Sequence, residues 1–412
     1  MKVAIMGYGV VGSGVAELLN KNRANIIKKS TQPGLDLKYI LEVKDFPGDP
    51  NEGLIIKDFE TILNDSEVGI VVETMGGMSP AYEYTLACLK AGKSVVTSNK
   101  EVVAAKGYEL LKVADQMNVS YLFEASVGGG IPIIRPINQC LAANEIKEIA
   151  GILNGTTNFI LTRMINDAMS FDDALKLAQE KGYAEKDPTA DVEGHDACRK
   201  ICILSSLSFG RHVYPEQVYT EGITKIDLAD VEYARTWGGA IKLIGRAKKL
   251  DDGRITAMVS PALVEGHSQL AGVEGVFNAI LVRGDATGDV VFYGRGAGKM
   301  PTASAVVADV IDIAGQCNSK KLIAWEDGGD DYVADYKLTQ TAAYIRCQTQ
   351  NMVAALKEVE SLFGQTQPLT RQDALEGEFA FITGLMAEKD LVGLMERLTS
   401  AEVLSFIRIT DY

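Results

Sequence analysis

The chain has 412 residues, more than a single hydrophobic core usually supports, so we expect two or three domains. Hydrophobic residues make up 47% of it and charged residues 23%, the balance of a globular protein rather than a disordered one. The net charge of -14 disfavours binding to nucleic acid and to anionic membrane surfaces, which require a positively charged protein face.

Neither a membrane span nor a secretory signal is expected. No apolar run is long enough to cross a bilayer, and the N-terminus is a short strand followed at once by a glycine turn. The six cysteines show neither a disulfide framework nor zinc-site spacing, which favours a reducing compartment. We therefore expect a cytoplasmic protein that binds neither nucleic acid nor a membrane.

Residues 1 to about 130 alternate short apolar strands with amphipathic helices, the pattern of a parallel sheet covered by helices on both faces. Helices are predicted at Pro80–Lys93 and Lys100–Asn118. The predicted strands are Lys2–Gly7, Leu35–Val43, Gly69–Thr74, Ser94–Thr97 and Val119–Glu124.

From about residue 131 to 299, longer helices mix with strands as in an α+β domain. Ser170 predicts a helix start and Gly182 its end, and Pro301–Cys317 is predicted to be a helix that returns to the first domain. Residues 325–332 are polar and acidic and predict an exposed linker. Beyond it, a small separate βαββαβ domain is predicted from Thr341–Thr349, Asn351–Phe363, Glu378–Thr383, Lys389–Leu398 and Val403–Ile409.

A glycine motif follows the first strand and opens the first helix: Gly7-Tyr8-Gly9-Val10-Val11-Gly12. In such a G-x-G-x-x-G loop the glycines allow a tight turn, close approach of the backbone to a pyrophosphate, and close contact between helix and strand. The helix N-terminus offers free N–H groups and a positive dipole end to the phosphates. A purely structural turn is the alternative, but strand, motif and helix together predict a Rossmann-type dinucleotide site.

The end of the second predicted strand bears on the choice between NAD and NADP. An acidic residue ending this strand would bind the ribose 2′-hydroxyl of NAD, whereas Leu41-Glu42-Val43 is followed by Lys44. We interpret Lys44 as a cation suited to the 2′-phosphate of NADP, which favours NADP over NAD. A solvated lysine beside Asp45 is the other interpretation.

An acidic loop, residues 182–200, is interrupted by Gly and Pro and runs into an apolar helix. Its carboxylates suit a substrate that bears an ammonium group, and they equally suit a solvated loop. Asp196 and Lys200 are four residues apart and share a helix face. This spacing fits either an ordinary ion pair or a partly desolvated lysine that transfers a proton. Upstream, Asn154 begins a turn that caps a helix.

Several sequence blocks resemble the homoserine dehydrogenase family over about residues 1–320. The resemblance implies the reversible NAD(P)-linked interconversion of L-homoserine and L-aspartate 4-semialdehyde, a step towards threonine and methionine. The blocks are Gly151-Ile152-Leu153-Asn154-Gly155-Thr156-Thr157-Asn158, the acidic run 182–196 followed by Lys200, Thr97-Ser98-Asn99-Lys100, the run 123–132, and Gly294-Arg295-Gly296-Ala297-Gly298 with Pro301-Thr302.

The same resemblance implies roles for individual residues. Lys200 would be the proton donor and acceptor, and Lys100 a second cationic group at the junction of cofactor and substrate. Glu185 and Asp196 would hold the amino acid head of the substrate, with Asp191 supporting the site. The dinucleotide would be bound by Gly7, Gly9, Val10, Val11, Gly12, Lys44, Ser98, Lys100, Gly182 and Gly298.

A monovalent cation site is also implied by the resemblance. Glu124, with the carbonyl groups of Val127, Gly129 and Ile131, matches the family's site. An all-oxygen ligand set suits sodium, a hard cation. The residues alone indicate only a glycine-rich turn that carries the chain between domains.

The predicted fold class is therefore α/β with additional domains. A Rossmann-type nucleotide-binding domain would comprise residues 1–130 and 300–320, and an α+β substrate-binding and dimerisation domain residues 131–299. Residues 336–412 resemble an ACT domain, a βαββαβ module that binds amino acids, but residues 348–353 lack its usual Pro-Gly turn. We expect this tail chiefly to serve assembly into a homodimer or higher homo-oligomer, with weak or altered control by threonine.

Two other functions remain open. The chain could be another Rossmann oxidoreductase that acts on amino acids or semialdehydes, although an acylating enzyme needs a nucleophilic cysteine that no motif here provides. It could also be a non-catalytic sensor of a dinucleotide or an amino acid. A sensor has no need of a proton-transfer lysine, so the presence of Lys200 with its acidic neighbours argues against it.

Overall fold

The computed structural model describes residues 1–30, 34–315 and 323–412. They form two compact units, each assembled from separate stretches of the chain. The first unit comprises residues 1–145, 202–215 and 294–329, and the second comprises residues 146–201, 216–293 and 330–412. Cys317 and the end of the predicted helix Pro301–Cys317 lie outside the described residues. In the described part of the chain, no helix is both long and apolar enough to cross a membrane.

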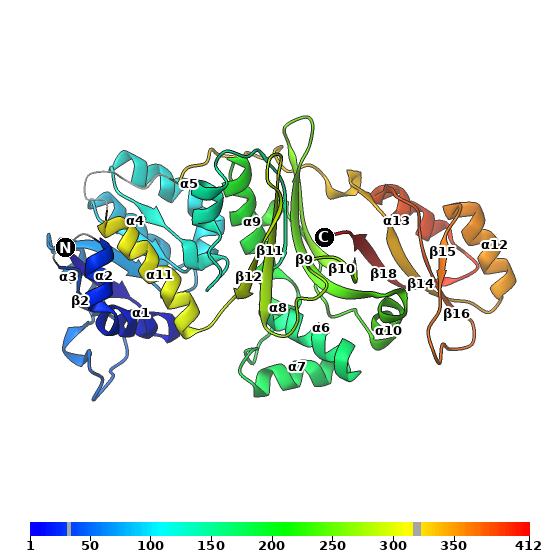
Figure 1. The fold of residues 1–412 in the computed structure, drawn as a ribbon, viewed down its shortest axis with the longest axis horizontal. Coiled ribbons are helices and arrows are strands. Elements are labelled where there is room, and N and C mark those ends of the chain that lie inside the picture. Colours follow the sequence, from blue (N-terminus) through cyan, green and yellow to red (C-terminus); the bar gives the residue numbers. More distant parts are fainter. Residues whose placement is uncertain (31–33, 316–322) are drawn as a thin grey trace. The chain divides into compact units, whose positions relative to one another are not determined.

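A six-stranded parallel sheet forms the centre of the first unit (Figure 1). Its strand order is β3-β2-β1-β4-β5-β6, the doubly wound order that places a ligand crevice where the order reverses, beside β1 and β4. The sequence predicted every strand except β3, which is too short to show a pattern. The strands are β1 Lys2–Met6, β2 Asp36–Leu41, β3 Ile55–Ile56, β4 Val68–Glu73, β5 Ser94–Thr97 and β6 Tyr121–Leu122.

The helices of the first unit include one that returns from late in the sequence, as predicted. Helix α11 packs against α1, where a Cβ atom added to Gly14 would lie 3.0 Å from the side chains of Ala303 and Lys299. Glycine at this position therefore lets the two helices approach closely. The helices are α1 Val10–Lys21, α2 Arg23–Ser30, α3 Phe59–Asn64, α4 Ala81–Lys90, α5 Lys100–Gln116 and α11 Lys299–Ala314.

A ten-stranded mixed sheet forms the second unit, and its longest pairing is the antiparallel one between β9 and β10. The strand order is β12-β11-β7-β9-β10-β18-β14-β16-β15, with β8 pairing beside β10. In chain order, the first six strands of this sheet are β7 Ile146–Ile152, β8 Tyr219–Thr220, β9 Gly239–Lys249, β10 Ile255–Glu265, β11 Phe277–Gly284 and β12 Gly288–Arg295.

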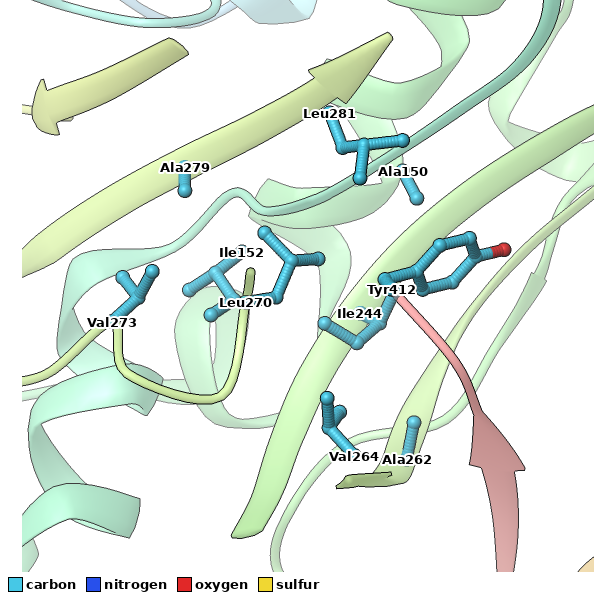
Figure 2. Packing of buried hydrophobic residues seen from close by; sticks show 10 residues of the cluster. All are labelled: Ala150, Ile152, Ile244, Ala262, Val264, Leu270, Val273, Ala279, Leu281 and Tyr412. Carbon is cyan, nitrogen blue, oxygen red and sulfur yellow. The ribbon is translucent and has the colours of Figure 1, made fainter. Parts of the chain in front are cut away.

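The two faces of this sheet are covered differently. Successive strand residues point to opposite faces, so Gly245 and Ile244 of β9 mark the two sides. A Cβ atom on Gly245 would lie 2.8 Å from the Leu153 side chain and 3.4 Å from Ile201, so the helical side lies there. Ile244 belongs instead to a buried apolar cluster that includes Tyr412 (Figure 2). The helices of this unit are α6 Gly155–Asp167, α7 Phe171–Glu180, α8 Thr189–Val192, α10 Leu228–Trp237 and the first part of α9 His195–Phe209, which continues into the first unit from residue 202.

The C-terminal βαββαβ segment is not set apart from the rest of the second unit, although the sequence predicted a separate domain. Its last strand, β18, pairs in parallel with β10, so one sheet runs through both parts (Figure 1). Arg408 on β18 forms ion pairs with Glu388 and Glu221, and Arg346 on β14 pairs with Asp230 of α10. The elements are β13 Gln340–Thr341, β14 Ala343–Gln348, α12 Met352–Phe363, β15 Gln367–Leu369, β16 Glu378–Ile382, β17 Met386–Ala387, α13 Glu388–Arg397 and β18 Glu402–Thr410.

Two local predictions can be compared directly with the structure. The Ser170 hydroxyl accepts a hydrogen bond from the Asp173 N–H and caps α7, as its sequence predicted. The segment 325–332 is less exposed than predicted, because Trp325 and Tyr332 at its ends are buried. Trp325 packs edge-on against Phe123, with ring centroids 5.6 Å apart. This aromatic contact holds the start of the segment whose polar residues predicted an exposed linker.

Candidate active site

The glycine loop has the geometry that the dinucleotide interpretation requires. Gly7 has a φ of +93°, which side chains rarely adopt, and a Cβ atom on it would lie 2.9 Å from the backbone of Met75. A Cβ atom on Gly12 would lie 2.0 Å from the Gly7 carbonyl oxygen, so helix and loop can meet only at a glycine. A Cβ atom on Gly9 would meet nothing within 4 Å. The loop is therefore tight within the protein and open on the side where a pyrophosphate would approach.

Helix α1 starts directly at this open side, with Val10 and Val11 in its first turn. The N-cap residue, Gly9, has no side chain that could cap the helix, and Val10 is 67% exposed. The N–H groups of the first turn and the positive end of the helix dipole are thus presented to an anion. Gly298, the predicted cofactor residue farthest along the chain, precedes α11 in the same unit.

The end of β2 carries two charged groups of opposite sign. Lys44 is exposed, as expected of a residue that contacts a phosphate from the surface. Glu42, two residues earlier, faces the glycine loop and accepts the N–H of Tyr8 at 2.9 Å. The structure therefore places a carboxylate beside the loop where the sequence interpretation relied on a cation alone.

Ser98 and Lys100 are positioned by a chain of hydrogen bonds between β4 and β5. The Thr97 hydroxyl donates to Glu73 at 2.6 Å, and the Asn99 N–H donates to the Thr97 oxygen at 2.9 Å. The Asn99 side chain then caps α5, which begins at Lys100. Burial raises the pKa of Glu73, although its hydrogen bonds oppose this. Lys100 is consequently held at the first position of a helix, at the carboxyl edge of the parallel sheet.

In the second unit, four side chains form one hydrogen-bonded array: the buried Asn154, Asp196 and Lys200, and the partly buried Asp191. The Lys200 ammonium donates to Asp196 Oδ2 at 2.7 Å and to the Leu153 carbonyl oxygen, also at 2.7 Å. Asn154 Nδ2 donates to Asp191 Oδ1 at 2.7 Å and to Asp196 Oδ2 at 2.9 Å. The structure thus brings Asp191, Asp196 and Lys200 together, and the sequence had predicted all three as site residues.

Asn154 is the member of this array whose part the sequence did not reveal. Its Oδ1 accepts the Thr157 N–H at 2.8 Å, which fixes the orientation of the amide, because a backbone N–H can only donate. Nδ2 must then point at the two carboxylates. The predicted helix cap is therefore confirmed, and the same side chain also bridges two like charges.

The Asp191 carboxyl responds to several neighbours. Burial raises its pKa, the hydrogen bond from Asn154 lowers it, the like charge of Asp196 raises it, and the charge of Lys200 lowers it. The net direction is upward. Such a displaced pKa at a buried charged cluster is typical of functional sites.

Glu185 and Gly182 lie on the loop before the array and are exposed. Gly182, with a φ of +72°, ends the turn after α7, and the Glu185 carbonyl oxygen accepts Gln179 Nε2 at 3.1 Å. Glu185 is not one of the four joined side chains. Its carboxylate faces solvent, from where it can meet an incoming ammonium group.

Comparisons with known proteins agree over both units. The family model described as "Homoserine dehydrogenase, NAD binding domain" matches residues 7–124, and the one described as "Homoserine dehydrogenase" matches residues 132–311. A homoserine dehydrogenase of Corynebacterium glutamicum is 38% identical over 422 residues, covering 98% of this chain and 94% of that relative. The chain belongs to the homoserine dehydrogenase family. It is an NAD(P)-linked oxidoreductase that interconverts L-homoserine and L-aspartate 4-semialdehyde, a step in threonine and methionine biosynthesis.

Solved structures of homoserine dehydrogenases share this fold. The structure from Thiobacillus denitrificans superposes with a TM-score of 0.88 and is 34% identical, covering 100% of this chain and 98% of that one. A hyperthermophilic archaeal homoserine dehydrogenase in complex with NADPH has a TM-score of 0.64 and 29% identity, over 78% of this chain and 99% of that one. The predicted α/β fold with a Rossmann-type sheet is therefore confirmed.

The side chain of Glu124, a residue of the predicted cation site, is buried and hydrogen-bonded. Its carboxylate oxygens accept the backbone N–H groups of Ile133, Ile134 and Arg135 at 2.6 to 2.9 Å. These three hydrogen bonds hold the Glu124 side chain against a turn of the protein. Among the described residues, no cluster of three His, Cys, Asp or Glu side chains able to hold a metal occurs.

Proposed function

We propose that Lys200 transfers the proton in this homoserine dehydrogenase and that Asp196 holds it in place. The observation that carries the proposal is the buried ammonium, fixed between Asp196 Oδ2 and the Leu153 carbonyl oxygen at 2.7 Å each. In the oxidation of homoserine, the neutral amine of Lys200 would accept the proton of the hydroxyl oxygen, and the carbon that bears this hydroxyl would lose a hydride to the bound nicotinamide cofactor. In the reverse direction the ammonium donates that proton to the developing alkoxide, which its charge also stabilises.

The carboxylates of the array and its loop would bind the substrate's ammonium group. Glu185 is exposed and meets the substrate first, whereas Asp196 is buried and shared with Lys200. Asp191 supports the site by accepting from the same Asn154 nitrogen, Nδ2, that donates to Asp196. The negative charges of these three residues are complementary to the ammonium group of an amino acid substrate.

The glycine loop and the first turn of α1 would hold the dinucleotide, which supplies the hydride acceptor when bound. The fit is good, since the Gly9 side of the loop is open and the helix N-terminus is uncapped by a side chain. Ser98, Lys100 and Gly298 are proposed as further contacts, and Lys100 as the second cationic group of the reaction. Lys44 would favour NADP, the cofactor form seen with the archaeal relative.

Further proposals concern the rest of the assembly. Glu124, with the carbonyl groups of Val127, Gly129 and Ile131, is proposed to bind a monovalent cation such as sodium. Residues 336–412 are proposed to be an ACT-like regulatory or assembly domain that responds only weakly to threonine. We further propose a cytoplasmic homodimer or higher homo-oligomer, on the grounds of composition and resemblance given above.

The test is turnover of purified protein, followed by nicotinamide absorbance with L-homoserine and either NAD or NADP. L-2-aminobutyrate is the matched control, since it has the same carbon chain and ammonium group but no hydroxyl. We expect reduction of the cofactor with homoserine and none with the control. Binding of nucleotide and homoserine without any reduction would support a sensor and contradict the proposal.

A further inference from the structure

Glu42 directly follows β2, and its carboxylate is fixed against the glycine loop. Oε2 accepts the Tyr8 N–H at 2.9 Å, while Oε1 accepts the N–H groups of Val43 at 2.8 Å and Lys44 at 3.1 Å. On the strand side, the Gly7 N–H donates to the Leu41 carbonyl oxygen at 2.9 Å. The carboxylate therefore belongs to the wall of the dinucleotide loop.

The loop after β2 prevents this carboxylate from turning away. The buried Tyr8 ring meets Phe46 edge-on, with centroids 5.1 Å apart. Its hydroxyl donates to Asp49 at 3.0 Å and accepts from Asn51 Nδ2 at 2.9 Å. Tyr8 is thus held through its side chain as well as through its N–H bond to Glu42, and these contacts join the glycine loop to the loop after β2.

Glu42 is negatively charged at neutral pH. Partial burial alone would raise its pKa, but hydrogen bonds from the N–H groups of Tyr8, Lys44 and Val43, together with the charge of Lys44, bring it below its usual value. A carboxylate has about four acceptor positions, and the three backbone donors leave room for a further donor. A hydroxyl group can therefore be accepted here, whereas an anion would be repelled.

We infer that Glu42 is a specificity-determining residue that accepts the adenosine ribose 2′-hydroxyl of NAD(H) and repels the 2′-phosphate of NADP(H). The inference rests on the dinucleotide site proposed above. In Rossmann proteins that bind NAD, an acidic residue after the second strand accepts a hydrogen bond from this hydroxyl. Lys44, two residues on, attracts the phosphate that Glu42 repels. The two side chains act in opposite directions, so we expect the wild type to bind both cofactors with Kd values within about tenfold of each other.

The test is a titration of the full chain with NADH and with NADPH, without homoserine, followed by nicotinamide fluorescence. Glu42→Gln should lower the Kd of NADPH about tenfold and raise that of NADH about threefold to tenfold, because a charge is lost and a charge-assisted hydrogen bond is weakened. Lys44→Ala should change the ratio of the NADH Kd to the NADPH Kd in the opposite direction. Glu52→Gln is the matched control, since that carboxylate accepts the Gly48 N–H at 2.9 Å in the same loop. Its effect on the ratio should stay below about twofold.

A second variant, Glu42→Ala, guards against a local effect of the glutamine amide, and thermal melting shows whether each variant is folded. Two results would overturn the inference. One is a ratio of the NADH Kd to the NADPH Kd that stays within about twofold of the wild-type ratio in both folded variants. The other is an equal loss of affinity for both nucleotides. The second result would mean that Glu42 only holds the loop. If the wild type bound neither nucleotide, the proposed cofactor site itself would be wrong.

Discussion

Lys200 on α9 and Lys242 on β9 are both buried in the second unit, and both lie beside α6. Lys200 is paired with a carboxylate, Asp196, at 2.7 Å. Lys242 donates instead to neutral groups, the Val273 carbonyl oxygen at 2.6 Å and Asn158 Oδ1 at 3.3 Å. Burial without a hydrogen-bonded carboxylate lowers the pKa of Lys242 to about 8, although the charge of Glu274 opposes this.

An asparagine at the start of α6 lies near each lysine: Asn154 caps this helix, and Asn158 belongs to its first turns. Asn154 turns its amide N–H groups towards the carboxylates around Lys200. Asn158 turns its N–H groups towards three backbone carbonyl groups of residues 273–277 and its oxygen towards Lys242. The first arrangement hydrogen-bonds two carboxylates beside a lysine, and the second ties residues 273–277 to α6 next to the apolar cluster that includes Tyr412. A buried lysine is therefore not itself a sign of catalysis, and the groups around it decide its function.

Lys200→Ala should have the largest effect on turnover. We expect kcat to fall about 10³-fold, roughly 4 kcal/mol of transition-state stabilisation. The variant lacks the group that accepts the hydroxyl proton in oxidation and donates it in reduction. The Kd of NADH, measured by fluorescence, should remain unchanged. Lys200→Arg is the control, since it keeps a positive charge that cannot be released at neutral pH, and it should be almost as inactive. If either variant kept more than about a tenth of the wild-type kcat, the proton-transfer role would be wrong.

Asn154→Ser should lower kcat/KM for homoserine by about tenfold to a hundredfold. Serine still caps a helix, but it cannot donate to both Asp191 and Asp196. Because the Asn154 hydrogen bond lowers the pKa of Asp191, its loss should move the acidic limb of the pH profile of kcat/KM to higher pH. A reduced rate with an unmoved limb would show that Asn154 is only a helix cap. Ser170→Ala, which removes a cap of α7, is the control and should leave the profile unchanged.

Glu185→Gln should act mainly on substrate binding. We expect KM for homoserine to rise about tenfold, with a smaller fall in kcat, because the lost charge faces the substrate ammonium and not the proton in flight. Glu193→Gln is a control on the same acidic segment. A fall in kcat as large as that of Lys200→Ala would contradict this division of roles.

Lys242→Met should have the smallest effect on turnover, within about threefold of wild type. Its effect is expected in stability, measured by urea unfolding across pH. The folded-state pKa of about 8 lies below the ordinary 10.5, so the unfolded chain binds more protons between these values. The wild-type free energy of unfolding should therefore gain a contribution as pH rises from about 8 to 10.5, on the order of 3 kcal/mol, and lose it as pH falls through 8. Lys242→Met should lack this contribution, and a strong loss of turnover would remove the contrast with Lys200.

Local sequence was sufficient for the features that depend on neighbours along the chain. The glycine loop could be predicted because Gly7, Gly9 and Gly12 have fixed tasks between one strand and the next helix. Asp196 and Lys200 share a face because four residues make about one helical turn, and their ion pair has the predicted spacing. The βαββαβ order of the tail follows in the same way from periodicity within each element.

The tertiary structure decided whatever depends on residues that are distant along the chain. Asn154 meets Asp191 and Asp196 across separations of 37 and 42 residues, and Glu42 meets Tyr8 across 34. In the sequence, Lys242 is an ordinary polar residue of its strand. Only the folded structure brings it to its hydrogen-bond partners, Val273 and Asn158. The pairing of β18 with β10, which joins the tail to the larger sheet, has no local signal either. Such partners are selected by packing of whole elements, and a hydrogen bond or a displaced pKa exists only once that packing has brought the groups together.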